Sequence, residues 1–178
     1  MNESRGWVKE WQPNTDWQNG INWANQQLPC AQSLIQLPRD AVVSLYLAGR
    51  TSWGTLILPD RGELVLENDW SLVTTGEEVT CRDEAPVRGF TNWRPHSWFH
   101  PANWAIRQAD VSPDAVPHSE RIPCARDTVL LPDRHGFLID FNGWSWPLTI
   151  GALKYGQQVH DTLLPPHPNS LFKKLLFQ

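Results

Sequence analysis

The amino-acid sequence predicts an all-β fold, and three observations support this prediction. Fifteen prolines and eleven glycines are scattered through the 178 residues, which leaves few gaps long enough for an amphipathic helix. Short apolar or alternating runs recur between these turn residues, as expected of strands. The turns themselves repeat, because a Leu-Pro pair ends a strand-like run at Leu37-Pro38, Leu58-Pro59 and Leu131-Pro132.

The expected strands are runs of four to six residues bounded by turn chemistry. In chain order they are LIQL (34–37), VVSLYL (42–47), TLIL (55–58), ELVLE (63–67), SLVT (71–74), TVLL (128–131) and FLIDF (137–141). Proline ends a strand because it has no N–H to donate to the ladder, and aspartate favours the tight turn that follows.

The first two Leu-Pro turns are 21 residues apart, and the strands around them share that spacing. A period near 20 residues is typical of a solenoid, in which each coil covers the apolar face of its neighbour. We therefore expect an irregular β-helix of short strands. The alternative is a β-sandwich, which also strings short strands at intervals of about 8 to 12 residues.

Tryptophans set among turn residues form a second, longer repeat. WQPNTDWQNGINWANQQLPC (11–30) ends with a Pro-Cys pair, and NWRPHSWFHPANW (92–104) is followed by another. We match Trp11 and Trp23 with Trp93 and Trp104, and Trp98 or Phe99 takes the place of Trp17. Short strands need large rings to fill a core, so the sequence predicts structural aromatic anchors. These anchors are Trp11, Trp17, Trp23, Trp93 and Trp104. The alternative is a Trp-rich carbohydrate-binding module, whose exposed rings would stack on sugars.

The length and the net charge of the chain limit the classes of protein to which it can belong. At 178 residues we expect one domain, or one domain plus a tail. The formal net charge is −4 and the only basic run is Lys173-Lys174, which argues against a nucleic-acid partner. No stretch is long enough for a membrane-spanning helix, and MNESRGWVKEW lacks the apolar segment of a signal peptide.

Patterns that carry catalysis or metal binding are missing from the sequence. Neighbouring carboxylates such as Asp83-Glu84 point to opposite faces of a strand, so they do not converge as glycosidase carboxyls do, and a glycoside hydrolase fragment is disfavoured. His96-x3-His100 would pair two imidazoles on a helix, but Pro95 and Pro101 disfavour that helix. We expect a protein that is not an enzyme, with no catalytic residues, no metal site and no cofactor.

The three cysteines, Cys30, Cys81 and Cys124, show no C-x-x-C spacing, which argues against a zinc site or a redox pair. Cys30 and Cys124 lie in matched Pro-Cys contexts beside loops, where an extracellular bridge would fit. An odd count leaves one thiol without a partner in this sequence. Either that thiol is free, or its partner lies beyond the end of the sequence; three buried thiols in a cytosolic protein are the alternative.

The order of these motifs resembles the N-terminal ectodomain of the amnionless family. The matching stretches are WQPNTDW (11–17), NW (22–23), LPCA (28–31), LP (58–59), GELVL (62–66), CRDE (81–84), WFHPANW (98–104) and IPCARDTVLLP (122–132). The resemblance covers roughly residues 7–155, and more weakly the tail. It implies one domain over residues 7–155, with 156–178 as the end of the same domain or a loosely ordered tail. W-x-P-N-T-D followed by G-E-L-V-L is the most specific part of it.

The resemblance implies a β-helical ectodomain that binds the N-terminal region of cubilin, a large peripheral receptor without a membrane anchor. Family members continue into a cysteine-rich module, one transmembrane helix and a tail with endocytic signals. With cubilin they take up protein ligands, including vitamin B12 bound to its carrier. On this resemblance the chain is a non-enzymatic assembly module of an endocytic receptor with a cubilin-like partner, and its partner-binding residues are not indicated.

Three further expectations follow from the resemblance. This sequence has no membrane anchor, so we expect a fragment or short isoform that reaches a membrane only through segments missing from it. The family resides on the extracellular side of the plasma membrane and in endosomes, and the location of this chain is left open. By analogy Cys30 bridges Cys81, while Cys124 pairs with a cysteine downstream of residue 178 or stays free; three reduced thiols are the alternative.

Overall fold

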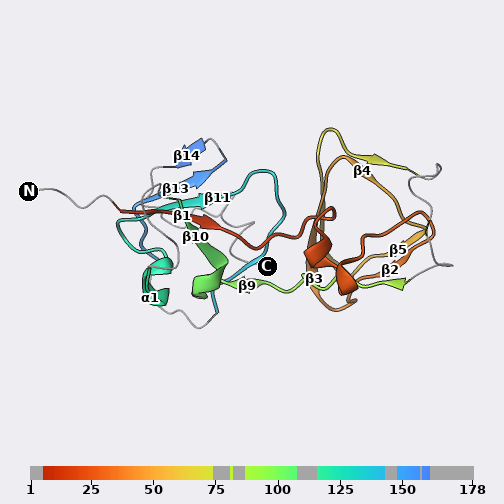
Figure 1. Cartoon of the computed structure of the whole chain (residues 1–178), viewed down its shortest axis with the longest axis horizontal. Coiled ribbons are helices and arrows are strands. Elements are labelled where there is room, and N and C mark those ends of the chain that lie inside the picture. The colour runs from red at the N-terminus through yellow and green to blue at the C-terminus, as the bar shows by residue number, and fades with distance from the viewer. Residues whose placement is uncertain are drawn as a thin grey trace, which may run out of the picture. The chain divides into compact units, whose positions relative to one another are not determined.

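Short strands dominate the protein, and the all-β prediction is confirmed (Figure 1). The computed structural model describes residues 6–73, 81, 87–107, 116–142 and 148–156, and the backbone of 158–160. The chain divides into two compact units. The central unit comprises Asn14–Pro95 and His135–Leu138, and the flanking unit comprises Met1–Pro13, His96–Arg134 and Ile139–Gln178.

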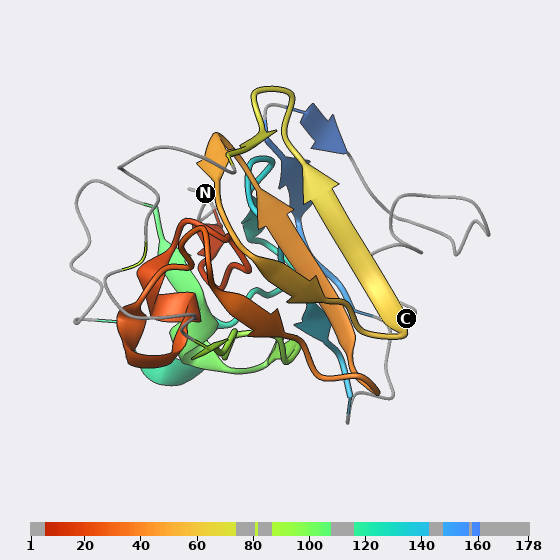
Figure 2. The same ribbon diagram turned by 90° about the vertical axis from the view of Figure 1, so that its right-hand side faces the viewer.

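Two successive layers of parallel strands form most of the central unit. Its elements are η1 (Gly20–Asn22), η2 (Ala24–Gln26), β2 (Leu34–Gln36), β3 (Val42–Leu47), β4 (Arg50–Thr51), β5 (Thr55–Ile57), β6 (Arg61–Leu66), β7 (Ser71–Leu72) and β8 (Val87–Arg88). We call residues 34–53 the inner layer and residues 55–72 the open layer. Strand β2 pairs with β5, β3 with β6 and β4 with β7, all in parallel. Figure 2 shows β6 running beside β3.

The spacing between paired residues explains the predicted period. Leu34 pairs with Thr55 and Arg50 with Ser71, both 21 residues apart, whereas Leu45 pairs with Leu64, 19 apart. The connection between β5 and β6 is shorter than the one between β2 and β3, so the spacing of paired residues falls from 21 to 19. The connection between β6 and β7 is longer than the one between β3 and β4, so the spacing returns to 21. This stacking is what neighbouring coils of a solenoid would show, and the complete irregular β-helix stays a prediction.

The core of the central unit lies behind the inner layer. Strand β3 is almost wholly buried, and alternate residues of it enter one apolar cluster. The buried members of this cluster are Trp17, Trp23, Ile35, Leu37, Val43, Leu45, Leu47 and Phe90. The inner layer is also covered on its other side, because Asp16 bridges Tyr46 and β8 pairs with β2.

The flanking unit is built on one mixed sheet in the order β10-β1-β11-β13-β14. Its elements are β1 (Val8–Trp11), β9 (His96–Ser97), η4 (Pro101–Asn103), β10 (Trp104–Ile106), α1 (His118–Arg121), β11 (Thr128–Leu131), β12 (Ile139–Asp140), β13 (Ala152–Tyr155) and β14 (Gln158–His160). Strand β11 pairs in parallel with β1 and β13. Strand β14 then pairs antiparallel with β13 and covers its outer edge.

The same hydrogen bonds recur in both units. The indole Nε1 of Trp23 donates to the carbonyl of Trp17 (2.8 Å), and that of Trp104 donates to the carbonyl of Trp98 (2.7 Å). The longer sequence repeat is therefore real, but its alignment was wrong in one place. Trp98 stands with Trp104 as Trp17 stands with Trp23, which agrees with the predicted match. The match of Trp11 with Trp93 was wrong, because Trp11 packs edge to face on Trp104 as Phe90 does on Trp23.

The turns at the two Pro-Cys pairs also match. The N–H of Cys30 donates to Ser33 Oγ and that of Cys124 donates to Asp127 Oδ2, each at 2.9 Å. The carbonyls of Ser33 and Asp127 then accept from the N–H of Gly54 and Gly151, again each at 2.9 Å. A polar side chain three residues after each cysteine thus fixes the turn that starts a parallel strand pair.

A buried ion pair anchors the turn of the flanking unit. Lys9, only 2% exposed, places Nζ 2.7 Å from Asp127 Oδ2 and also donates to the carbonyls of Glu120 and Ile122. Burial alone would raise the pKa of Asp127, but hydrogen bonds from Lys9 and from the N–H groups of Cys124 and Trp7 hold it below its usual value. All three ammonium donors are satisfied, so the pair is tolerated inside the protein.

Replacing Lys9 with methionine should leave Asp127 buried without its counter-ion. We expect the free energy of unfolding to fall by about 3–5 kcal/mol, measured by urea denaturation. Lys154→Met, in strand β13, is the matched control and should change it by less than about 0.5 kcal/mol. Equal effects of the two substitutions would show that the ion pair contributes nothing specific.

Gly62 allows the two layers of the central unit to approach each other. Its φ is +138°, and a Cβ added there would lie 2.1 Å from the carbonyl oxygen of Val43, its partner in the parallel ladder. A side chain would therefore push β6 away from β3. The glycine is required at this point of the open layer.

Gly62→Ala should destabilise the protein by about 3 kcal/mol, because it adds both backbone strain and a clash with the neighbouring strand. Gly89→Ala is the control, since its Cβ would meet only Ala24 Cβ at 3.7 Å. Urea unfolding followed by tryptophan fluorescence measures both variants. An unchanged midpoint for Gly62→Ala would contradict the close pairing of β3 and β6.

Candidate partner-docking surface

The open layer ends the stack of parallel strands without a further strand upon it. Strands β5, β6 and β7 are each the last in their sheets among the described residues, whereas β2 and β3 have neighbours on both sides. Their outer backbone N–H and C=O groups therefore point away from the inner layer without a strand partner in this part of the chain. Such an edge is a template for pairing with another strand.

The apolar side chains of the open layer continue the columns of the core but remain exposed. Leu64 stacks on Leu45 and Leu66 on Leu47, yet Leu64 and Leu66 are 41% and 50% exposed while their partners are fully buried. Six of the nine exposed large apolar residues in the described chain belong to this layer. They are Ile57, Leu58, Leu64, Val65, Leu66 and Leu72.

A hollow at one corner of this surface reaches the core. Its volume is about 270 Å³, and it is lined by Leu37 and Val43 of the inner layer as well as Leu58, Gly62 and Leu64. Two buried core residues thus contribute to a cavity wall at the open end. Asp60, Arg61 and Glu63 line the hollow as well, so its wall is part apolar and part charged.

The aromatic column of the central unit also ends in the open layer. Trp17 contacts Trp53 with ring centroids 4.8 Å apart, and Trp53 stacks on Trp70 at 6.3 Å with an interplanar angle of 20°. Trp70 Nε1 donates to Thr51 Oγ1 at 2.8 Å, which fixes the orientation of the ring. The open layer therefore combines an unpaired edge, exposed leucines and an oriented indole.

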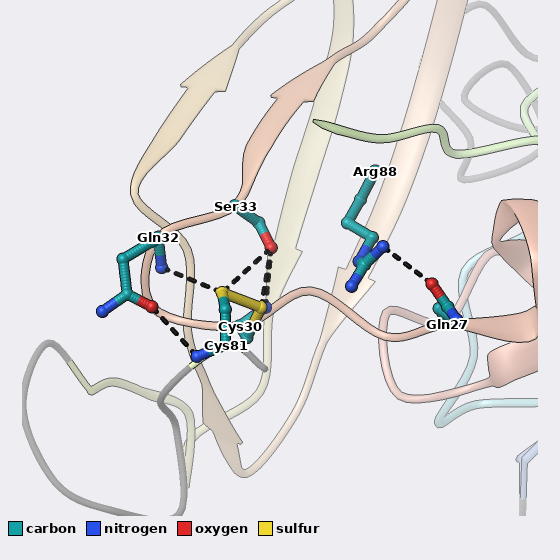
Figure 3. Close-up of a disulfide and its surroundings, with 6 residues drawn as sticks. All are labelled: Gln27, Cys30, Gln32, Ser33, Cys81 and Arg88. Carbon is teal, nitrogen blue, oxygen red and sulfur yellow. Dashed lines mark hydrogen bonds between the residues drawn. A yellow bond between two sulfur atoms is a disulfide. The ribbon is translucent and has the colours of Figure 1, made fainter. Parts of the chain in front are cut away.

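A disulfide between Cys30 and Cys81 encloses both layers (Figure 3). Cys30 precedes β2 and Cys81 follows β7, and their Cα atoms are 5.3 Å apart. Gln32 holds Cys81 by two contacts, since its N–H points to Cys81 Sγ at 3.4 Å and its Oε1 accepts from the Cys81 N–H at 3.0 Å. The bridge ties the start of the inner layer to the chain that leaves the open layer.

The other residues singled out from the sequence are dispersed. Trp11, Trp17, Trp23 and Trp104 are 2–3% exposed, whereas Trp93 is partly buried beside Arg94. The thiol of Cys124 is exposed and free. His96 lies in β9, where burial and then the nearby charge of His100 lower its pKa. In the described residues, no three histidine, cysteine or carboxylate side chains come together as metal ligands.

Sequence reasoning found the strands of the open layer but missed that they form an uncovered end. The run ELVL has the same apolar character as the buried run VVSLYL, so composition does not distinguish a covered strand from an open one. One signal was present. The 21-residue spacing of Leu-Pro turns stops after Leu58-Pro59, because Val79-Thr80 occupies the next expected position.

These features define a disulfide-bonded, all-β protein with stacked parallel strands and an apolar end that no strand of the described residues covers. Within the part of the chain that the structure describes, no helix is long and apolar enough to span a bilayer. A family model described as Amnionless matches residues 8–163, and the chain therefore belongs to the amnionless family.

Three curated relatives carry the name protein amnionless. The chain is 28% identical to the dog protein over 153 residues, 28% identical to the human protein over 148 and 27% identical to the Drosophila melanogaster protein over 140. These alignments cover 85%, 82% and 78% of this chain but 33%, 32% and 27% of the relatives. The chain spans about a third of the length of the proteins it matches.

Replacing both Cys30 and Cys81 with serine should lower the free energy of unfolding by about 4 kcal/mol, because the bridge closes a loop of roughly 50 residues. Cys124→Ser should leave stability unchanged, since that thiol is exposed and unbridged. Urea denaturation measures both effects. Peptide mapping of the oxidised protein should find a fragment joining residues 30 and 81, and a link from either of them to Cys124 would contradict this pairing.

Proposed function

We propose that this chain is a non-enzymatic assembly module of an endocytic receptor, and that a cubilin-like partner docks on its open layer. In this role it would support membrane anchoring, trafficking and uptake of protein ligands, including the carrier of vitamin B12. The module would act on the extracellular side of the plasma membrane and in endosomes. Membership of the amnionless family and the motifs shared with its N-terminal ectodomain support this proposal.

The observation that carries the proposal is the edge of β5, β6 and β7, on which no strand of the described residues lies. An exposed apolar edge strand promotes aggregation unless something covers it. A partner strand laid on this edge would satisfy the outer backbone groups and bury exposed leucines such as Leu64 and Leu66 together. Backbone pairing would supply the orientation, and the leucine columns would supply apolar burial.

The flanking unit provides an internal precedent for a covered edge. Strand β13 occupies the place there that β5 occupies in the central unit, because each pairs in parallel with the strand that follows its Pro-Cys turn. In the flanking unit β14 pairs with the outer side of β13. The equivalent side of β5 is uncovered within the described residues, and we assign it to a strand of the partner.

A carbohydrate-binding module would need indole faces that a sugar can reach. Trp11, Trp17, Trp23, Trp98 and Trp104 are instead 2–3% exposed and pack edge to face with other rings. Their burial favours the role of internal anchors. The disulfide favours a protein that folds in an oxidising compartment.

Binding of the oxidised chain to the N-terminal region of a cubilin-like receptor tests the proposal by calorimetry or surface plasmon resonance. Leu64→Asp combined with Leu66→Asp should weaken binding at least about 100-fold, because it places two charges in a buried contact. Val87→Asp is the control, since Val87 is 68% exposed on the opposite side of the stack. Circular dichroism checks that each variant is folded.

A wild-type chain that is correctly oxidised and folded but does not bind would overturn the proposed function. Binding that survives the double leucine substitution and is lost with Val87→Asp would move the docking surface to the other edge.

A further inference from the structure

The open layer differs in charge from the layer on which it stacks. Its residues 55–72 hold four acidic side chains and one arginine, whereas residues 34–53 hold one aspartate and two arginines. The acidic residues of the open layer are Asp60, Glu63, Glu67 and Asp69. An acidic layer therefore lies on a slightly basic one.

The contacts between the two layers follow this difference. Arg39 of the inner layer faces Asp60 at 3.3 Å, and Arg61 of the open layer donates to the carbonyl of Asp40 at 3.2 Å. Asp69 accepts from the N–H of Gly49 at 3.3 Å, and Glu67 accepts from the hydroxyl of Tyr46. Ser44 Oγ also donates to Glu63 Oε1 at 3.1 Å, so each acidic side chain of the open layer has a partner in the inner layer. Arg39 is the one cation among these partners.

We propose that the outer side of the open layer selects a basic partner strand, in which lysine or arginine side chains alternate with apolar ones. This inference rests on the proposed function and names the chemistry of its partner. The apolar residues would cover Leu64 and Leu66. The basic residues would reach Asp60 and Asp69, which remain exposed in addition to their contacts with Arg39 and with the N–H of Gly49. Opposite charges paired across neighbouring strands stabilise a sheet, while like charges destabilise it.

The same charge disfavours a second copy of this chain as the occupant. Two open layers placed edge to edge would bring together two surfaces that each carry an excess of three negative charges. Like-charge contacts at an edge prevent pairing between identical strands. The acidic layer would therefore remain available for a partner of opposite charge.

The test is the salt dependence and charge dependence of binding to the cubilin-like N-terminal fragment. Asp60→Asn combined with Asp69→Asn should weaken binding about tenfold at low salt and reduce the slope of log Kd against log salt concentration. The matched control is Glu120→Gln with Asp133→Asn, which removes the same charge from exposed positions of the flanking unit. It should leave both quantities within about twofold of the wild type.

The outcomes separate this inference from the proposed function. One outcome overturns charge selection while docking stands. In it the wild type binds, the variant with Leu64→Asp and Leu66→Asp does not bind, and neither salt nor the Asp60 and Asp69 substitutions change the affinity. If the control weakens binding as much as the Asp60 and Asp69 pair, only the net charge matters and the inference also fails. Absence of wild-type binding overturns both proposals.

An independent arm uses two 12-residue synthetic peptides, one alternating valine with lysine and the other valine with glutamate. Amide NMR shifts of the full chain should move in β5, β6 and β7 with the lysine peptide and remain fixed with the glutamate peptide. Equal shifts with both peptides, or shifts confined to residues outside these strands, would contradict selection by the open layer.

Discussion

The parallel ladder between β3 and β6 is the constraint on which the central unit depends. It sets the columns in which Leu45 lies under Leu64 and Leu47 under Leu66, and it determines which side chains reach the core. It also requires a glycine at position 62, where no Cβ fits beside Val43. The exposed leucines and the charge contrast between the layers are consequences of this register.

Two copies of one local pattern produce the two units. In each, a tryptophan six residues after another donates its indole N–H back to the first, and a polar side chain three residues after a cysteine fixes a turn. In the central unit the polar side chain is a serine, and in the flanking unit it is Asp127, which recruits Lys9 into a buried ion pair. The pattern tolerates this exchange because its backbone hydrogen bonds stay the same.

The strands of the inner and open layers could be predicted because proline and apolar runs mark them locally. Strands β1 and β10 were missed, since Val8–Trp11 contains Lys9 and Glu10 and reads as polar until the ion pair with Asp127 is known. The match of Trp11 with Trp93 was wrong because the true counterpart of Trp11 in the other unit is not a tryptophan. Trp11 packs edge to face on Trp104 as Phe90 does on Trp23, and a phenylalanine in one copy hides the match.

The candidate surface could be predicted only in part, because exposure depends on what lies beside a strand. The same sequence character buries β3 and exposes β6, and the difference arises from the number of layers placed upon each. Local patterning specifies the strand but not its neighbours. The carboxylates of the open layer were visible in the sequence, yet their arrangement on one edge became apparent only with the register.

The position of the cysteine bridge has a consequence for the covalent integrity of the chain. Because Cys30 and Cys81 bracket both layers, a single cut by a protease anywhere between them would leave two fragments still joined through sulfur. Such a nicked molecule would gain only the mass of one water, and its two pieces would separate only after a reductant broke the bridge. A cut within the open layer would therefore not divide the molecule.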